Sequence, residues 1–130
     1  MARRRVIFHI DVNSAFLSWT AIRLMKDGMS DIRLVPSVVS GDPSDRRSII
    51  TAASIPAKRL GIRTADPVSM ALRKCPGLVI VKGDWEWYRI CSRGFIEICR
   101  SYSPVLQQFS IDECFIDMTT SPFSFTKQGI

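Results

Sequence analysis

The amino-acid sequence predicts an α+β fold. Hydrophobic residues make up 46% of the 130 residues and aromatic residues 9%, which is enough to bury the core of one ordinary domain. Short apolar runs rich in β-branched residues alternate with segments in which apolar residues recur at helical spacing. Neither an internal repeat nor a low-complexity linker interrupts the chain. We therefore expect one compact unit, within which residues 19–82 could form a subdomain.

The first segments predict a strand, a tight turn and a helix. Residues 6–12 form a short apolar run, which indicates a buried strand. Asn13 or Ser14 can cap the helix that follows, and Gly28 ends it. The apolar positions at helical spacing between them are Ala15, Phe16, Trp19, Ile22, Leu24 and Met25.

A small hairpin is expected in the next part of the chain. Residues 33–39 and 47–53 have the composition of strands, and residues 41–45 supply the turn between them. Pro36 lacks the N–H group that a central strand needs, so it predicts that the first of these strands lies at a sheet edge.

Two short basic helices and a strand follow the hairpin. Ser54 can cap the first helix, which Gly61 ends, and the second helix runs from residue 66 to Lys74. Residues 78–81 form another apolar, strand-like run.

The last third predicts a long helix and a second hairpin. The helix is expected at residues 84–102, with Gly94 as its one weak point. Residues 105–110 and 114–118 are apolar and strand-like, and residues 111–113 (Ile-Asp-Glu) lie between them. The pattern therefore places acidic side chains at or near the turn of a hairpin, whose strands the long helix is expected to cover.

The charge of the chain favours a polyanionic partner. The net charge is +6 and the sequence pI is about 9.6, and each Lys or Arg that neutralises a phosphate releases a counterion. Charge alone leaves nucleic acid and an anionic membrane surface both open. The amino-terminal apolar run is short and lacks a small-residue cleavage site, so no signal peptide is expected, and no run approaches transmembrane length.

The four cysteines, Cys75, Cys91, Cys99 and Cys114, predict no metal chemistry. They form no CxxC pair, and His9 is the only histidine, so a zinc site has no ligand set. Cys91 and Cys99 are two helical turns apart, and we expect them to be two buried thiols in a reduced, cytoplasmic protein.

Three acidic residues are candidates for metal binding. Nucleotidyl transfer needs two divalent cations about 4 Å apart, held by hard oxygen ligands. Asp11 ends the first predicted strand, and Asp112 and Glu113 lie at the second hairpin, all flanked by apolar strand residues. Taken separately, each has a common structural explanation, as a helix cap or as a solvated turn. Set among apolar strands, however, such charges need cations or partners.

These residues and their flanks resemble the two acidic motifs of Y-family DNA polymerases, of the translesion, SOS-mutagenesis type. The first motif is IDVNSAF at residues 10–16, and the second, more specific one is FSIDECFID at residues 109–117. Between them, IPAKRLGI at residues 55–62 resembles the fingers segment of that family, and ALRKCP at residues 71–76 resembles the piece after it. Order and spacing agree over nearly the whole chain.

The resemblance implies a partial ferredoxin-like polymerase palm with a small α/β fingers subdomain inserted. Residues 1–18 and 84–130 would be palm, and residues 19–83 would be fingers. The remaining palm, the thumb and the little finger would be missing, so the chain is expected to be an amino-terminal fragment that is inactive alone. The missing palm strand would leave a sheet edge unpaired, so we also expect the fragment to self-associate.

The resemblance also implies the roles of individual residues. Asp11, Asp112 and Glu113 would be catalytic and would bind two Mg²⁺ ions, together with the backbone carbonyl of Val12. Phe16 would be the steric gate that excludes the 2′-hydroxyl of a ribonucleotide. The residues expected to bind the nucleotide are Ala15, Phe16, Ile55 and Lys58. Without the resemblance, Phe16 would be ordinary helix core and Lys58 part of a solvated basic face.

Three positions depart from the family pattern. Ile55 stands where many relatives have a tyrosine that hydrogen-bonds the triphosphate. Lys58 stands where an arginine is usual, and it cannot form the planar fork of a guanidinium. Asn13 replaces a second aspartate and resembles the SOS-mutagenesis branch. The grip on the triphosphate is therefore expected to be weaker or differently arranged.

The function implied is DNA synthesis across damage, with a primer–template and a deoxynucleoside triphosphate as substrates and no membrane partner. One alternative is an inert, polymerase-like module that binds nucleic acid. Another is a small nucleic-acid-binding domain, but the sequence lacks the aromatic pattern that a sheet binding RNA would be expected to show. A nucleotide cyclase is a third, but its glycine-rich acidic turn is absent. The basic residues available for phosphate contact are Arg46, Arg47, Lys58, Arg59, Arg63, Arg73 and Lys74.

Overall fold

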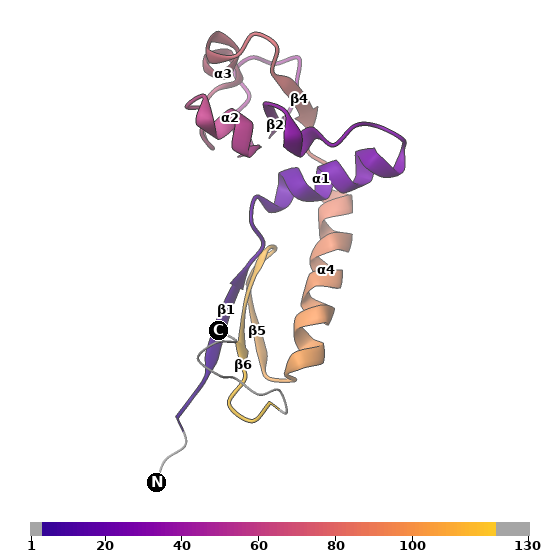
Figure 1. Cartoon of the computed structure of the whole chain (residues 1–130), viewed down its shortest axis with the longest axis vertical. Helices are drawn as coiled ribbons and strands as arrows, with labels where there is room; N and C mark the ends of the chain where they lie inside the picture. The colour runs from indigo at the N-terminus through magenta and orange to yellow at the C-terminus, as the bar shows by residue number, and fades with distance from the viewer. Residues whose placement is uncertain (1–3, 122–130) are drawn as a thin grey trace. The chain divides into compact units, whose positions relative to one another are not determined.

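The computed structural model describes residues 4–121, which fold as two compact units (Figure 1). The first unit contains the chain up to Val12 and from Arg89 onward, and the second contains Asn13–Tyr88. The boundaries expected from the sequence lie after residues 18 and 83, whereas the structure divides the chain after Val12 and Tyr88.

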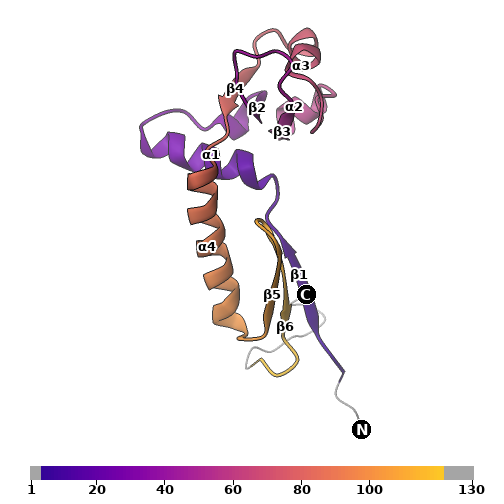
Figure 2. The same ribbon diagram turned by 180° about the vertical axis from the view of Figure 1, so that it is seen from behind.

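The first unit is an antiparallel sheet covered on one face by a helix. Its strands are β1 (Ile7–Asp11), β5 (Leu106–Ser110) and β6 (Glu113–Asp117), in the order β1-β6-β5. The covering helix is the larger, carboxy-terminal part of α4 (Trp85–Tyr102), which runs alongside the sheet in Figures 1 and 2. The expected strand, hairpin and covering helix are therefore confirmed.

The alternation of side chains along each strand decides which face of this sheet the helix covers. Successive side chains of a strand point to opposite faces. Cys114 and Ile116 of β6 point to one face and are buried with Ile96 and Cys99 of α4. Phe8 and Ile10 of β1 pack against the same cluster. The residues between them, such as His9 and Phe115, consequently point to the other, open face.

The second unit is a three-stranded mixed sheet with helices on both faces. Its strands are β2 (Ser37–Ser40), β3 (Ile50–Ala53) and β4 (Val79–Lys82), in the order β3-β2-β4. β2 pairs antiparallel with β3 and parallel with β4. The helical segments are α1 (Ala15–Lys26), the 3₁₀ turn η1 (Ile32–Leu34), α2 (Ile55–Arg59) and α3 (Val68–Lys74).

The second unit has two buried hydrophobic clusters, and each of two neighbouring valines of β2 belongs to one of them. Val38 lies in a cluster with buried residues of α2 and α3, among them Ala57 and Ala71. Val39, the next residue, packs with Leu17 and Ala21 of α1. All four residues of β2 are buried, because helices cover the sheet on both faces.

Two expectations about this unit were wrong in detail. The expected strand at residues 33–39 is shorter, because η1 occupies Ile32–Leu34. Pro36 did not mark an edge, since β2 is the central strand of its sheet. Pro36 precedes the strand, and its carbonyl accepts a hydrogen bond from the Val79 N–H. This bond does not need the backbone N–H group that proline lacks.

The caps of the helices met the expectations in part. Ser54 caps α2 as expected, because its hydroxyl accepts a hydrogen bond from the Ala57 N–H at 3.1 Å. Ser14 precedes α1 in the left-handed conformation (φ 46°), and its side chain makes no capping bond. Gly28 follows α1 with φ 83°, a conformation that glycine adopts without strain.

The four cysteines are free thiols; Cys99 is buried as expected, as is Cys114, whereas the expectation of a buried Cys91 was wrong, because Cys91 is only half-buried. Burial and the neighbouring Cys99 raise the pKa of the Cys114 thiol to about 11. Within residues 4–121, no helix combines the length and the apolar composition needed to cross a membrane. β1 and β5 form the two edges of the first sheet, and self-association of the chain stays a prediction.

Replacing Ser54 with alanine is expected to destabilise the second unit by about 2–4 kcal/mol. The buried hydroxyl accepts hydrogen bonds from the Ser37 and Ala57 N–H groups and donates one to the Val35 carbonyl at 2.8 Å. Each buried N–H left without a partner costs about 1–3 kcal/mol. Urea unfolding followed by circular dichroism measures the change. Ser30→Ala, at an exposed position, is the control and should stay within about 0.5 kcal/mol of the unchanged protein.

Candidate metal and nucleotide sites

The three predicted metal-binding acids meet at one end of the first sheet. Asp11 is the last residue of β1, and Glu113, the first residue of β6, lies opposite it in the strand register. Asp112 belongs to the turn between β5 and β6. The Val12 N–H donates a 3.0 Å hydrogen bond to the Asp112 carbonyl and so holds the end of β1 against this turn. The structure thus brings together Asp11, Val12, Asp112 and Glu113.

Two further side chains hold these acids in place. The Ser110 hydroxyl donates a 2.9 Å hydrogen bond to Oδ1 of Asp112. Nε2 of His9 lies 3.0 Å from Oε2 of Glu113. Neither His9 nor Ser110 was assigned a role by the sequence analysis. Each lies two residues before an acid, His9 before Asp11 and Ser110 before Asp112, and this spacing was the available signal.

The charges of the acids oppose one another. The pKa of the Asp11 carboxyl is raised above its ordinary value of 3.8, first by partial removal from water and then by the negative charges of Asp112 and Glu113; His9 opposes the shift. Within residues 4–121, no Lys or Arg forms an ion pair with any of these three carboxylates. The site is therefore rich in negative charge and poor in compensating cations.

The oxygen atoms that these residues offer are chemically suited to bind a divalent cation. Carboxylate and carbonyl oxygens are the ligands that Mg²⁺ prefers, and a cation would relieve the repulsion that acts on Asp11. In the described part of the chain, however, no three His, Cys, Asp or Glu side chains converge closely enough to form a complete metal-binding group. The residues fit a metal ion, but their side chains are not gathered around one point.

The predicted nucleotide-binding residues lie in the second unit. Lys58 Nζ donates a 3.1 Å hydrogen bond to the Ser14 hydroxyl, so α2 places this cation at the start of α1, near Ala15 and Phe16. Ile55 is the first residue of α2 and is 63% exposed. Ala15 is buried, with 3% of its surface exposed.

Phe16 is packed among aromatic rings that the sequence analysis did not connect with it. Its ring lies 4.9 Å from the ring of Tyr88 and 5.2 Å from that of Trp85, measured between centroids. The Tyr88 ring is itself buried, and its hydroxyl shares a 2.6 Å hydrogen bond with that of Thr20. The orientation of Phe16 is therefore fixed by its neighbours. The signal in the sequence was the spacing of Trp85 and Tyr88, one helical turn apart.

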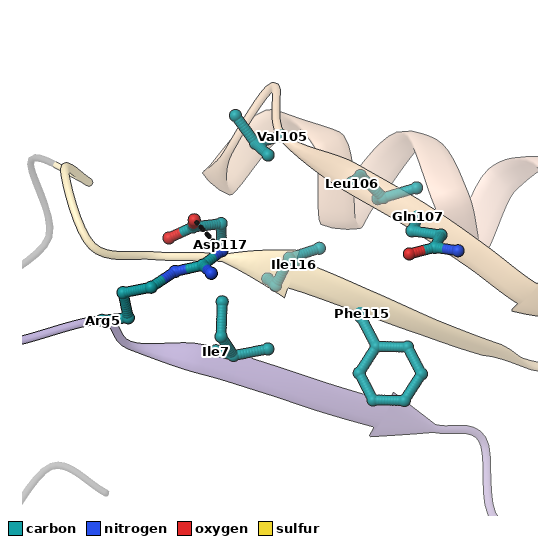
Figure 3. A pocket seen from close by; sticks show the side chains of 8 residues that line it. All are labelled: Arg5, Ile7, Val105, Leu106, Gln107, Phe115, Ile116 and Asp117. Atoms are coloured by element: carbon teal, nitrogen blue, oxygen red, sulfur yellow. Dashed lines mark hydrogen bonds and ion pairs between the residues drawn. The ribbon is translucent and has the colours of Figure 1, made fainter.

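The open face of the first sheet carries a shallow groove (Figure 3). The Arg5–Asp117 ion pair, at 3.4 Å, lies toward one end, and the Phe115 ring lies toward the other. The groove has a volume of about 450 Å³ and is lined by Arg5, Ile7, Val105, Leu106, Gln107, Phe115, Ile116 and Asp117. The groove lies on the face of the sheet opposite α4, which is also the face to which Glu113 points.

Comparison with known protein families settles the family question. Residues 10–128 match the model of the impB/mucB/samB family. This chain belongs to that family. The matched region includes both acidic motifs and the fingers-like segment between them, and the Y-family resemblance seen in the sequence is confirmed.

The relatives of this family member include curated bacterial polymerases. A protein named DNA polymerase IV from Clostridium acetobutylicum is 44% identical over 116 residues, which are 88% of this chain and 29% of that protein. DNA polymerase IV 1 of Bacillus subtilis is 35% identical over 122 residues, which are 94% of this chain and 28% of that protein. The chain thus spans less than a third of the length of either relative.

A solved structure supports the fold. A Y-family DNA polymerase chimera superimposes with a TM-score of 0.78 at 18% sequence identity, over 87% of this chain and 32% of the chimera. The predicted α+β fold class, resembling the fingers and palm region of such polymerases, is confirmed.

Removing the charge of Asp112 is expected to lower the pKa of Asp11. The raised pKa means that the folded protein binds a proton on Asp11 more tightly than the unfolded chain does. Asp11 therefore stabilises the fold fully below pH 3.8 and loses that contribution as the pH rises through its folded pKa. NMR titration of the Asp11 carboxyl in the metal-free protein measures the change in Asp112→Asn.

Asp117→Asn is the matched control for this titration, because Asp117 pairs with Ile7 at the opposite end of the same two strands. It should leave the pKa of Asp11 unchanged. An equal shift of the Asp11 pKa in both variants would mean that the repulsion at Asp11 does not come from its neighbour Asp112.

Proposed function

We propose that this chain is the amino-terminal part of a template-directed DNA polymerase, called here the parent polymerase. The observation that carries the proposal is the cluster of Asp11, Asp112 and Glu113 at one sheet end, set in the two family motifs and unpaired by any Lys or Arg within residues 4–121. In the proposed reaction, the 3′-hydroxyl of a primer attacks the α-phosphate of a deoxynucleoside triphosphate and pyrophosphate leaves.

The first unit, as palm, would hold two Mg²⁺ ions with Asp11, Asp112, Glu113 and the carbonyl of Val12. When bound, such ions activate the attacking oxygen and neutralise the charge on the leaving group. The contribution of the protein is the placement of the ligands. The strand register sets Asp11 beside Glu113, and the Val12–Asp112 bond fixes the turn.

The second unit, as fingers, would bind the incoming nucleotide. Lys58, already placed beside the start of α1 by its bond to Ser14, would contact the triphosphate. Ile55 offers an exposed apolar side chain in place of a hydrogen-bonding group, so the triphosphate would be held mainly through the charge of Lys58. Phe16, braced by Tyr88 and Trp85, would act as the steric gate.

The proposal extends to the biological setting that the resemblance implies. The substrates would be damaged template DNA, a primer and deoxynucleotides, and the parent polymerase would act in the cytoplasm during the SOS response. The net charge of +6 suits a DNA partner. These 130 residues span less than a third of the length of the relatives that they match, so we expect them to be inactive by themselves.

Replacing Asp112 with asparagine is expected to reduce primer extension by the parent polymerase about a thousandfold. A bound metal ion contributes several kcal/mol to stabilising the transition state, and each 1.4 kcal/mol or so is a factor of ten in rate. Gel-based primer extension with Mg²⁺ measures the rate, with Asp117→Asn as the control variant. If the unchanged parent polymerase binds DNA but never extends a primer, the chain belongs instead to an inert, polymerase-like binding module.

Replacing Phe16 with alanine is expected to raise the incorporation of ribonucleotides relative to deoxynucleotides by about 10- to 100-fold. The smaller side chain leaves room for the 2′-hydroxyl, and one such steric contact is worth discrimination of about that size. The ratio of kcat/KM for a ribonucleotide and its deoxynucleotide is the measurement. Trp19→Ala, which alters the same aromatic cluster from a buried position, is the control; an equal effect there would assign the change to loosened packing.

A further inference from the structure

His9 lies on the open face of the first sheet, next to the acidic cluster. Along β1, alternate residues share a face, so His9 and Asp11 point the same way. On the paired strand β6, Phe115 lies opposite His9 and Glu113 lies opposite Asp11. The His9 side chain is about half exposed, at 47%, and its Nε2 approaches Oε2 of Glu113 diagonally, at 3.0 Å.

The imidazole ring of His9 is held in its orientation by a row of aromatic rings. It stacks on Phe115 with centroids 4.5 Å apart and planes 16° from parallel. The ring of Phe109, from β5, meets Phe115 edge to face at 6.0 Å. Stacking restricts rotation of the imidazole, so Nε2 stays directed at Glu113. An exposed histidine without such support would sample other rotamers.

The contact restrains one carboxylate oxygen of Glu113 and leaves the other available. Glutamate has one more rotatable bond than aspartate, so its carboxylate loses more conformational freedom when it is fixed. The bond to His9 occupies Oε2, and no hydrogen bond within residues 4–121 engages Oε1. Side chains that hydrogen-bond a metal-binding carboxylate commonly set its orientation and strengthen its hold on the metal.

We infer that His9 is a positioning residue for Glu113: its ring, braced by Phe115, holds the Glu113 carboxylate in the orientation in which Oε1 receives the cation. The inference rests on the proposed function, since it assumes that Glu113 binds a divalent cation. His9 itself touches neither the substrate nor the metal in this role. Its effect is on the affinity for the cation, with a smaller effect on the rate once the cation is bound.

Binding of Mn²⁺, observed by electron paramagnetic resonance, tests the inference independently of activity. The parent polymerase is titrated in complex with a primer–template and a non-hydrolysable deoxynucleotide. We expect His9→Ala to weaken Mn²⁺ binding about tenfold, the lower end of what loss of such a contact commonly costs. His9→Gln keeps a donor and should retain binding within about threefold. Phe115→Leu, which removes the stacked ring but not the bond, should fall between the two.

Primer extension at graded Mg²⁺ concentrations supplies the second readout. His9→Ala should raise the Mg²⁺ concentration for half-maximal rate about tenfold and change the rate at saturating Mg²⁺ by less than about threefold, because the ligand itself remains. Gln107→Ala is the matched control: it lies on β5 opposite Phe115, is exposed, and makes no contact with the acids. Thermal unfolding of each variant verifies that the sheet is intact.

The outcomes separate the inference from the proposed function. If the unchanged parent polymerase extends primers and His9→Ala equals it in Mn²⁺ affinity and in Mg²⁺ requirement, the positioning role is wrong and the polymerase assignment stands. If His9→Ala and His9→Gln lose saturating rate and thermal stability together, His9 has only a structural role and the inference is likewise overturned. If the unchanged protein extends no primer, the proposed function fails, whatever His9 does.

Discussion

The pairing of β1 with β6 is the interaction on which the candidate metal site depends. It joins the first strand of the chain to one of the last, in a register that sets Asp11 opposite Glu113. The bond from the Val12 N–H to the Asp112 carbonyl continues this pairing into the turn. A shift of one residue in the register would turn the side chains of β1 to the opposite face, and Asp11 would then point to the helix-covered side.

The two strands that make this pairing, β1 and β6, are separated in the sequence by the whole second unit. The chain leaves the first unit at Val12 and returns to it at Arg89. Closing so long a loop costs conformational entropy, although the cost grows only slowly with loop length. The second unit reduces the freedom of the intervening chain, because it folds around its own sheet with a buried cluster on either side of β2. The two acidic motifs are thus distant in sequence and adjacent in one sheet.

Local rules predicted those features that depend on neighbouring residues. The Ser54 cap, the hairpin with Asp112 in its turn and the long helix after residue 84 all follow from short-range patterns, and the structure contains them. The prediction of an edge strand from Pro36 was wrong, because a missing N–H excludes a residue from the interior of a central strand but not from the position just before it. The contacts of His9 and of Phe16 with its aromatic neighbours were not predicted, since they join residues whose proximity only the tertiary fold creates. The roles proposed for Asp11, Asp112 and Glu113 rest on motif resemblance, and the structure adds their proximity to one another.

The electrostatics of the acidic cluster make a purely structural role an unfavourable explanation. The chain has 18 Lys and Arg residues against 12 acidic ones, so cations for neutralising a structural cluster are abundant. Cations of this kind are used elsewhere in the first unit, where Arg5 pairs with Asp117 at the far end of the same strands. Within residues 4–121, Asp11, Asp112 and Glu113 have only His9 as a basic partner, and partial removal from water, together with repulsion by the other two acids, raises the pKa of Asp11. Such an arrangement costs stability in the free protein and is repaid only when a positive charge binds, because like charges at a partly desolvated site disfavour their own ionisation. The half-exposed histidine restrains one acid without neutralising all three, which leaves the negative charge of the site available to a cation.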